Sequence, residues 1–134
     1  MFLYLLNENE GKAFLELSNI AIKLDNEIQI WEQAEFENYL LELNLNEYSL
    51  VGLSFDEAVS CFKLSSVPVK RSVIIELCGI LYSHKDIDSK MKDWITMLAN
   101  KLGINQVETE RLIRWSKDFS DFLEIGLMYI NAKS

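Results

Sequence analysis

The feature that most constrains this chain is the stretch from position 67 to position 102, which predicts two helices joined by a polar turn. The first helix begins at Val67-Pro68, because proline is tolerated in the first helical turn. Its apolar residues then recur at helical spacing: Val73, Ile74, Leu77, Ile80 and Leu81. Further apolar residues widen this stripe, so that apart from Lys70, Arg71 and Glu76 little of the helix is suited to water. We therefore expect a buried central helix.

The second helix of this stretch is amphipathic. Asp88 is its expected N-cap, and Gly103 stands where a left-handed residue ends a helix. The apolar stripe between them consists of Met91, Trp94, Ile95, Leu98 and Leu102.

Helical patterns also fill the chain before position 67. Asn7 and Glu10 form a capping box before a stripe made of Ala13, Phe14, Leu17, Ile20, Ala21 and Leu24. A second helix is expected from Ile30 to Leu43. Its inward residues are Trp31, Ala34, Phe36, Leu40 and Leu43, and its outward residues are Glu32, Glu35, Glu37 and Glu42. Residues 44–53 give no readable pattern, and Ser54 with Glu57 makes another capping box.

The chain after Gly103 is also periodic. Asn105 and Glu108 make a third capping box, followed by the apolar anchors Val107, Leu112 and Ile113. Further along, one face gathers Phe119, Phe122, Leu123, Gly126, Leu127 and Ile130. We expect this face to dock the C-terminal segment on the core.

These patterns define the fold class. The chain has 134 residues, 49% of them apolar, and one proline, and no segment alternates with the period of a strand. The sequence predicts one all-α domain over residues 1–134, a compact bundle of about six or seven helices. Cys61 and Cys78 are expected to be free buried thiols. Without an export signal or an apolar run of roughly 20 residues, we expect a cytoplasmic protein with no membrane span.

The net charge of −8 is unevenly distributed. Residues 1–57 contain 12 acidic and 2 basic residues, whereas residues 58–134 contain 9 acidic and 11 basic residues. An acidic half repels phosphate backbones, so no nucleic-acid binding is expected through it. A basic protein partner or a cation is more compatible, although the same carboxylates also suit the solvated faces of amphipathic helices.

Two parts of the chain, about 7–46 and 67–104, echo each other at an offset of 59 to 60 residues. In each, an apolar helix with a Glu-Leu pair leads into a polar turn and an amphipathic helix. The turns read Leu24-Asp25-Asn26-Glu27-Ile28 and Ser83-His84-Lys85-Asp86-Ile87-Asp88.

This layout resembles the TerB-like family, which is associated with tellurite resistance and repeats the signature Ala-Asp-Gly-Glu-Ile. Asn26 stands at the glycine of the first copy, and His84 and Lys85 stand at the aspartate and glycine of the second. The resemblance implies an all-helical fold built from two related helix–turn–helix units. It also implies acidic loops of the kind suspected of binding metal.

The weak metal-ligand candidates are Asp25, Glu27, Asp86 and Asp88, all in these turns. Counting from His84 or Asp86, no glycine falls at the sixth position and no glutamate at the twelfth, so the calcium-loop pattern is not met. One histidine and two separated cysteines do not supply the ligand set of a structural zinc. The same acidic residues also suit helix caps and turns, and we expect no cofactor.

No catalytic signature is found, and His84 has no nucleophile beside it in the sequence. The leading interpretation is a non-catalytic TerB-like module, a protein-interaction or stress-associated accessory protein. It would bind a protein partner, possibly a basic one, through its acidic N-terminal half. Two alternatives stay open: a cation-binding stress protein that uses the acidic turns, and an acidic immunity or inhibitor protein that binds a basic partner.

Overall fold

The computed structural model describes residues 1–24, 33–84 and 86–133. Its elements are a short 3₁₀ helix η1 (Leu3–Leu5) and six α-helices: α1 (Glu8–Leu24), α2 (Gln33–Glu42), α3 (Phe55–Ser60), α4 (Val67–His84), α5 (Ser89–Lys101) and α6 (Gln106–Asn131). No strand occurs in these described ranges. The predicted all-α bundle is confirmed. The two repeated parts correspond to α1 with α2 and to α4 with α5.

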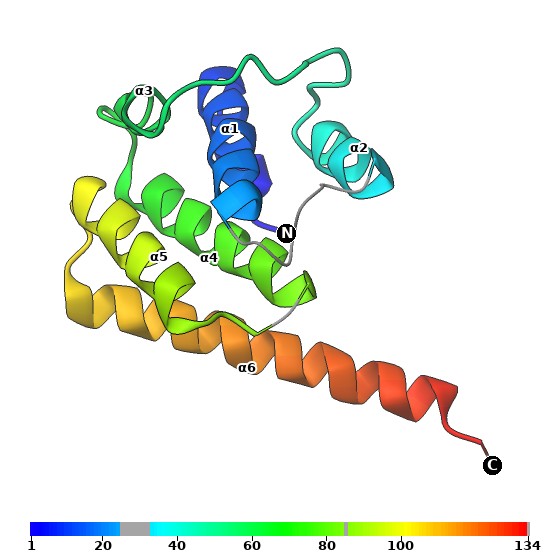
Figure 1. Cartoon of the computed structure of the whole chain (residues 1–134). Helices are drawn as coiled ribbons and strands as arrows, with labels where there is room; N and C mark the ends of the chain where they lie inside the picture. The colour runs from blue at the N-terminus through cyan, green and yellow to red at the C-terminus, as the bar shows by residue number, and fades with distance from the viewer. Residues whose placement is uncertain (25–32, 85, 134) are drawn as a thin grey trace.

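Helix α4 is the centre of the bundle, as the sequence predicts. Helix α1 and η1 pack on one side of it, and α5 and α6 pack on the other, while α3 lies against α1 (Figure 1). The most deeply buried side chains of α4 are Val73, Ile74, Leu77 and Cys78, each 0% exposed. An apolar helix with neighbours on opposite sides buries residues around most of its circumference, which explains the wide stripe.

The helix starts follow the sequence signals closely. Asn7 with Glu10 forms a reciprocal pair of hydrogen bonds, each 2.9 Å long, before α1. Ser54 and Glu57 do the same before α3. Asn105 caps α6 by accepting the Glu108 N–H at 2.8 Å. The carboxylate of Glu108 pairs with Arg71 on α4 instead of completing a third capping box.

The segment 44–53, which has no helical period in the sequence, is anchored to α1 by the buried carboxylate of Glu16. Glu16 on α1 is 1% exposed and accepts hydrogen bonds from the Tyr48 hydroxyl and from three successive backbone N–H groups, those of residues 51–53, at 2.9–3.1 Å. Burial alone would raise the pKa of Glu16. These hydrogen bonds outweigh burial, so the pKa lies below its ordinary value.

Several sequence expectations about burial were wrong. Glu76, which we assigned to water, is only 9% exposed because its carboxylate accepts the Phe2 N–H at 2.8 Å. Cys61, assigned to the core, is exposed, whereas Cys78 is buried, and both are free thiols. Ala34, expected to face inward, and Val107, expected as an anchor, are exposed. Helix α2 is described only from Gln33 onward, so the expected contribution of Trp31 lies outside the described residues.

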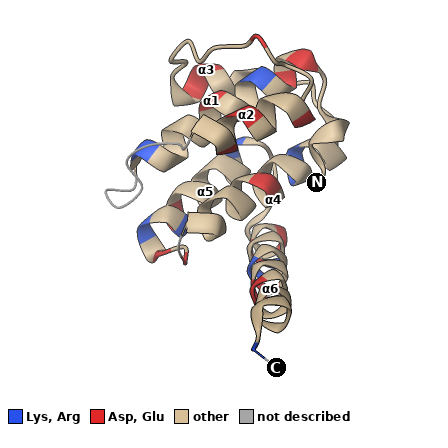
Figure 2. Cartoon of the chain, turned by 90° about the vertical axis from the view of Figure 1, so that its right-hand side faces the viewer, with Lys and Arg blue, Asp and Glu red and all other residues tan. Residues whose placement is uncertain are grey.

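The largest correction concerns the C-terminus. Instead of docking on the core, α6 continues as a single helix past the end of α4 and projects from the bundle (Figure 1 and Figure 2). We call residues 118–131 the α6 arm. Its exposed apolar residues, with their exposed fractions, are Phe122 (73%), Leu123 (55%), Ile125 (45%), Leu127 (58%), Met128 (66%), Tyr129 (78%) and Ile130 (79%). The periodicity was interpreted correctly as a helix face, but no described element covers that face.

No helix in the described part of the chain combines the length and the hydropathy that crossing a bilayer requires.

Candidate functional site

The candidate site is a groove between α4 and α6, closed at one end by the start of the chain and the end of α2. It has a volume of about 770 Å³. Its lining from α4 is Ile75, Glu76, Gly79, Tyr82, Ser83 and His84; from α6, Trp115, Ser116, Phe119, Ser120, Asp121, Leu123, Glu124 and Leu127; and from elsewhere, Met1, Phe2, Tyr39, Glu42 and Asp86.

Aromatic rings form one wall of the groove. Trp115 and Phe119, one helical turn apart on α6, stack with ring centroids 5.3 Å apart and planes 10° from parallel. Phe2 is a second aromatic neighbour of Trp115, with ring centroids 6.1 Å apart and planes tilted by 54°. Trp115 is still 43% exposed. A large aromatic side chain that is held by ring neighbours yet open to solvent offers apolar area at low entropic cost.

Five carboxylates also line the groove. Glu76 and Glu42 lie at the closed end, where both contact the Met1 ammonium, at 3.1 and 2.6 Å. Asp86 and Asp121 share Lys117, at 2.8 and 3.2 Å. Their hydrogen bonds raise the pKa of the Lys117 ammonium. The fifth carboxylate is Glu124, on the arm.

Glu124 differs from the other four carboxylates because no described residue forms an ion pair or a hydrogen bond with it. The arm as a whole contains Asp118, Asp121 and Glu124 and no lysine or arginine. The open end of the groove therefore has an acidic rim beside an apolar face.

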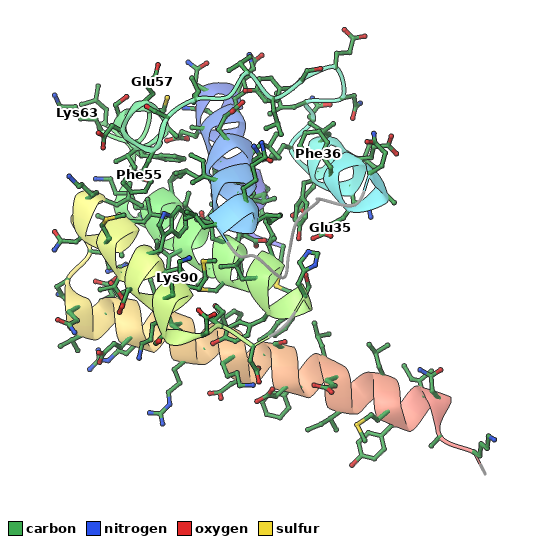
Figure 3. The ribbon with its side chains drawn as sticks, in the orientation of Figure 1. Glu35, Phe36, Phe55, Glu57, Lys63 and Lys90 are labelled. Atoms are coloured by element: carbon green, nitrogen blue, oxygen red, sulfur yellow. The ribbon has the colours of Figure 1, made fainter. Side chains whose placement is uncertain are left out.

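The groove and the arm belong to one continuous surface. Thr109, Ile113 and Ser116 are the buried residues of α6, and the same four-and-three spacing continues through Ser120 to Leu123 and Leu127. Contacts with α4 and α5 bury the first part of this stripe. Beyond the end of α4 the stripe is largely exposed, with Leu123 at 55% and Leu127 at 58%, and Figure 3 shows side chains of the last turns of α6 reaching into open space.

His84 ends α4 beside this surface. Its ring Nε2 lies 3.2 Å from the carboxylate of Glu35, which points from α2 toward the end of α4 (Figure 3). Both side chains are 20% exposed. The contact ties the two helices together at the edge of the groove.

The sequence-predicted metal ligands are not brought together in the described part of the chain. Asp88 caps α5 by accepting the Met91 N–H at 2.9 Å, and Asp86 pairs with Lys117. Asp25 and Glu27 lie outside the described residues. No group of three or more histidine, cysteine, aspartate or glutamate side chains suited to a metal ion occurs among the described residues. The two aspartates that can be placed serve a cap and an ion pair.

The described cysteines do not form a nucleophile with the histidine. Burial raises the pKa of the Cys78 thiol to about 12, which keeps it protonated at neutral pH. Cys61 lies at the end of α3, while His84 lies at the far end of α4. An 18-residue helix such as α4 is roughly 27 Å long.

Sequence reasoning missed the groove itself. It did not single out Tyr39, Tyr82, Asp121 or Glu124 as site residues, because the groove depends on where α6 passes α4 and α2. One signal was available: over positions 118–131 the chain is strongly apolar and carries three acidic residues without a basic one. Such a segment, if it is not docked, leaves an apolar face bordered by negative charge.

Comparison of the chain with protein-family models, with curated proteins and with solved structures found no match. The TerB-like resemblance therefore stays a prediction, and the function has to be argued from the groove and the α6 arm.

Proposed function

We propose that this chain is a non-catalytic, TerB-like protein-interaction module that binds a basic protein partner through the groove and the α6 arm. The observation that supports the proposal most is the uncovered apolar face of the arm, which a monomeric protein rarely leaves in contact with water. Phe122, Leu123, Leu127 and Ile130 share one helix face by their spacing. The other exposed apolar residues, Ile125, Met128 and Tyr129, lie around the rest of the helix. A contiguous apolar patch with a polar border is typical of an interaction site.

The charge of the site favours a basic partner. Five carboxylates line the groove. Among the described residues, the basic groups paired with them are the Met1 ammonium, which contacts Glu42 and Glu76, and Lys117, which contacts Asp86 and Asp121. Glu124, which is exposed and has no partner among the described residues, is accessible for pairing. Opposite charge on a partner would steer the encounter and specify its orientation. An inhibitor or immunity protein for a basic target would use the same chemistry, so this alternative differs in the identity of the partner and not in the surface.

The non-catalytic part of the proposal rests on the side chains available. The groove contains one histidine, already in contact with Glu35, and its described lining residues include no cysteine, lysine or arginine. The cation-binding alternative has no comparable support, since Asp86 and Asp88 have other partners in the structure.

The test is a selection from a random peptide display library with the purified chain as bait. We expect the enriched peptides to combine positive charge with apolar residues, and to bind the parent chain more tightly at low salt than at high salt. They should lose affinity for a Leu123→Ser/Leu127→Ser variant but not for Leu64→Ser, which changes an apolar side chain that is 97% exposed outside the groove. Enrichment of neutral or acidic peptides, or equal binding to all three proteins, would refute the proposal.

A further inference from the structure

The α6 arm and the groove together have the length and the residue spacing that suit binding of a helix. Ser120, Leu123 and Leu127 lie on one face of α6, because they are spaced by three and four residues. The 14 residues of the arm span roughly 21 Å at the rise of an α-helix. Anchors spaced by three and four residues along such a length match the apolar stripe of a second helix packed beside the first. An extended strand would instead need unpaired sheet edges, and the described part of the chain contains no strand.

The charges decide which helix fits. The border of the apolar stripe is negative, with Asp121 and Glu124 on the arm and Glu42 across the groove. A second copy of this chain would bring its own arm, with the same three carboxylates and no base, against this border. An anionic lipid surface is disfavoured for the same reason, since helices that lie on membranes carry lysine and arginine on the polar face.

We propose that the occupant of this surface is an amphipathic helix of a partner protein whose apolar stripe is flanked by lysine and arginine. Its apolar residues would pack on Trp115, Phe119, Leu123 and Leu127. The partner helix would thus lie beside α6 in the region past the end of α4. Its basic flanks would pair with Glu124 and Glu42. This inference rests on the proposed function and names the element of the partner that the groove receives.

The test uses defined synthetic peptides and the full chain. The first probe is an 18-residue peptide of about equal numbers of leucine and lysine, with the leucines at helical spacing. The second has the same composition in a scrambled order that forms no stripe, and the third replaces every lysine of the first by glutamate. Binding is measured by isothermal titration calorimetry. Peptide helicity is measured by difference circular dichroism, in which the spectrum of the free chain is subtracted from that of the mixture.

We expect the basic amphipathic peptide to bind and to gain helicity, and the other two to bind at least about tenfold more weakly. Leu123→Ser/Leu127→Ser should weaken binding at least about tenfold, because it removes central apolar anchors. Glu124→Lys should weaken it about fivefold, mainly at low salt. The matched controls are Leu64→Ser, and Glu110→Lys, which changes an exposed acid on α6 outside the groove; both should leave the affinity of the basic amphipathic peptide unchanged.

The possible failures are distinguishable. If the scrambled basic peptide binds as tightly as the amphipathic one, the helix inference is overturned while a basic partner is retained. If neither basic peptide binds, both the helix inference and the proposed function are refuted. Binding of the parent chain, but not of the leucine variant, to phosphatidylglycerol vesicles would show a membrane as the occupant. A dimer that the leucine variant dissociates in sedimentation equilibrium would show a second copy. Either result overturns the inference.

Discussion

The two halves of α6 have similar patterns and opposite surroundings. In residues 106–117, Thr109, Ile113 and Ser116 are buried against α4 and α5. In the arm, the continuation of the same stripe is exposed, with Leu123 at 55% and Leu127 at 58%. The comparison shows that an apolar stripe encodes the face a helix would bury, whereas the length of its neighbours decides whether the face is buried. Helix α4 ends before the stripe of α6 does.

The largest difference in stability between a substitution at a buried position and one at an exposed position is expected at the centre of the bundle. Leu77→Ala in α4 removes a side chain that is 0% exposed and leaves a cavity among close-packed neighbours, so the free energy of unfolding should fall by about 2–5 kcal/mol. Leu64→Ala, at a leucine that is 97% exposed, is the control and should change it by less than about 0.5 kcal/mol. Chemical denaturation gives both values, and equal midpoints would mean that α4 is not the core.

The same test can be made within α6. Ile113 is 7% exposed, and Ile113→Ala should lower the free energy of unfolding by about 2–4 kcal/mol. Leu127→Ala should change it by less than about 0.5 kcal/mol, because Leu127 has no covering neighbour to lose. Urea titrations of the two variants beside the parent measure the difference. Similar losses for both would show that the arm is packed in solution and would contradict the contrast between the halves.

The sequence predicted the helices better than it predicted their surroundings. Capping residues such as Ser54 and Asp88 act within one turn, so local spacing was sufficient to locate helix starts. The core of α4 was also predictable, because its stripe is wide and its neighbours lie on two sides. The docking of the arm and the burial of Glu76 depended on distant chain segments, which periodicity does not report.

The candidate site was less predictable than the fold for the same reason. Its residues come from α4, α6, the end of α2 and the first two residues, and none of these segments carries a recognisable motif by itself. The structural role of Glu16 was equally invisible. Its partners lie 32 to 37 positions away, in the segment 44–53 that has no helical period.

Buried and exposed positions can also be compared through two carboxylates, Glu16 and Glu124. Glu16 is enclosed and accepts four hydrogen bonds, whereas Glu124 on the arm has no described partner. Glu16→Gln should lower the free energy of unfolding by about 1–3 kcal/mol at neutral pH, since an amide brings two donors where donors already converge. Glu124→Gln should leave it within about 0.5 kcal/mol of the parent. Denaturation at pH 7 measures both changes.

The pH dependence of stability gives an independent measurement on Glu16. Its folded-state pKa lies below the ordinary value of 4.5, so the unfolded chain takes up this proton first as the pH falls. The contribution of Glu16 is therefore fully present above that ordinary value and is lost as the pH decreases through the folded-state pKa. The difference between the parent and Glu16→Gln should shrink over this acid range. A difference that stays constant from neutral pH to below the ordinary glutamate pKa would contradict the assigned role.

The smallest change in stability is expected for substitutions at two glycines inside helices. Gly79 lies in α4 and Gly126 in the arm, and at both a methyl group would meet no atom within 4 Å. Replacing a helix-interior glycine by alanine stabilises the helical state by about 0.5–1 kcal/mol, because glycine loses more backbone entropy on ordering. In α4 the helix forms only when the bundle folds, so Gly79→Ala should raise the global free energy of unfolding by that amount.

In the arm the same chemical change should act only locally. A segment of this length without tertiary contacts is marginal as a helix in water and opens without unfolding the bundle. Gly126→Ala should therefore leave the urea midpoint unchanged and slow amide hydrogen exchange in residues 122–131 by about two- to fivefold, which corresponds to 0.5–1 kcal/mol. It should also tighten binding of the basic amphipathic peptide modestly, because a pre-formed arm loses less entropy on binding. A rise in the global midpoint equal to that of Gly79→Ala would mean that the arm folds with the bundle, which requires a covering contact that the described residues do not provide.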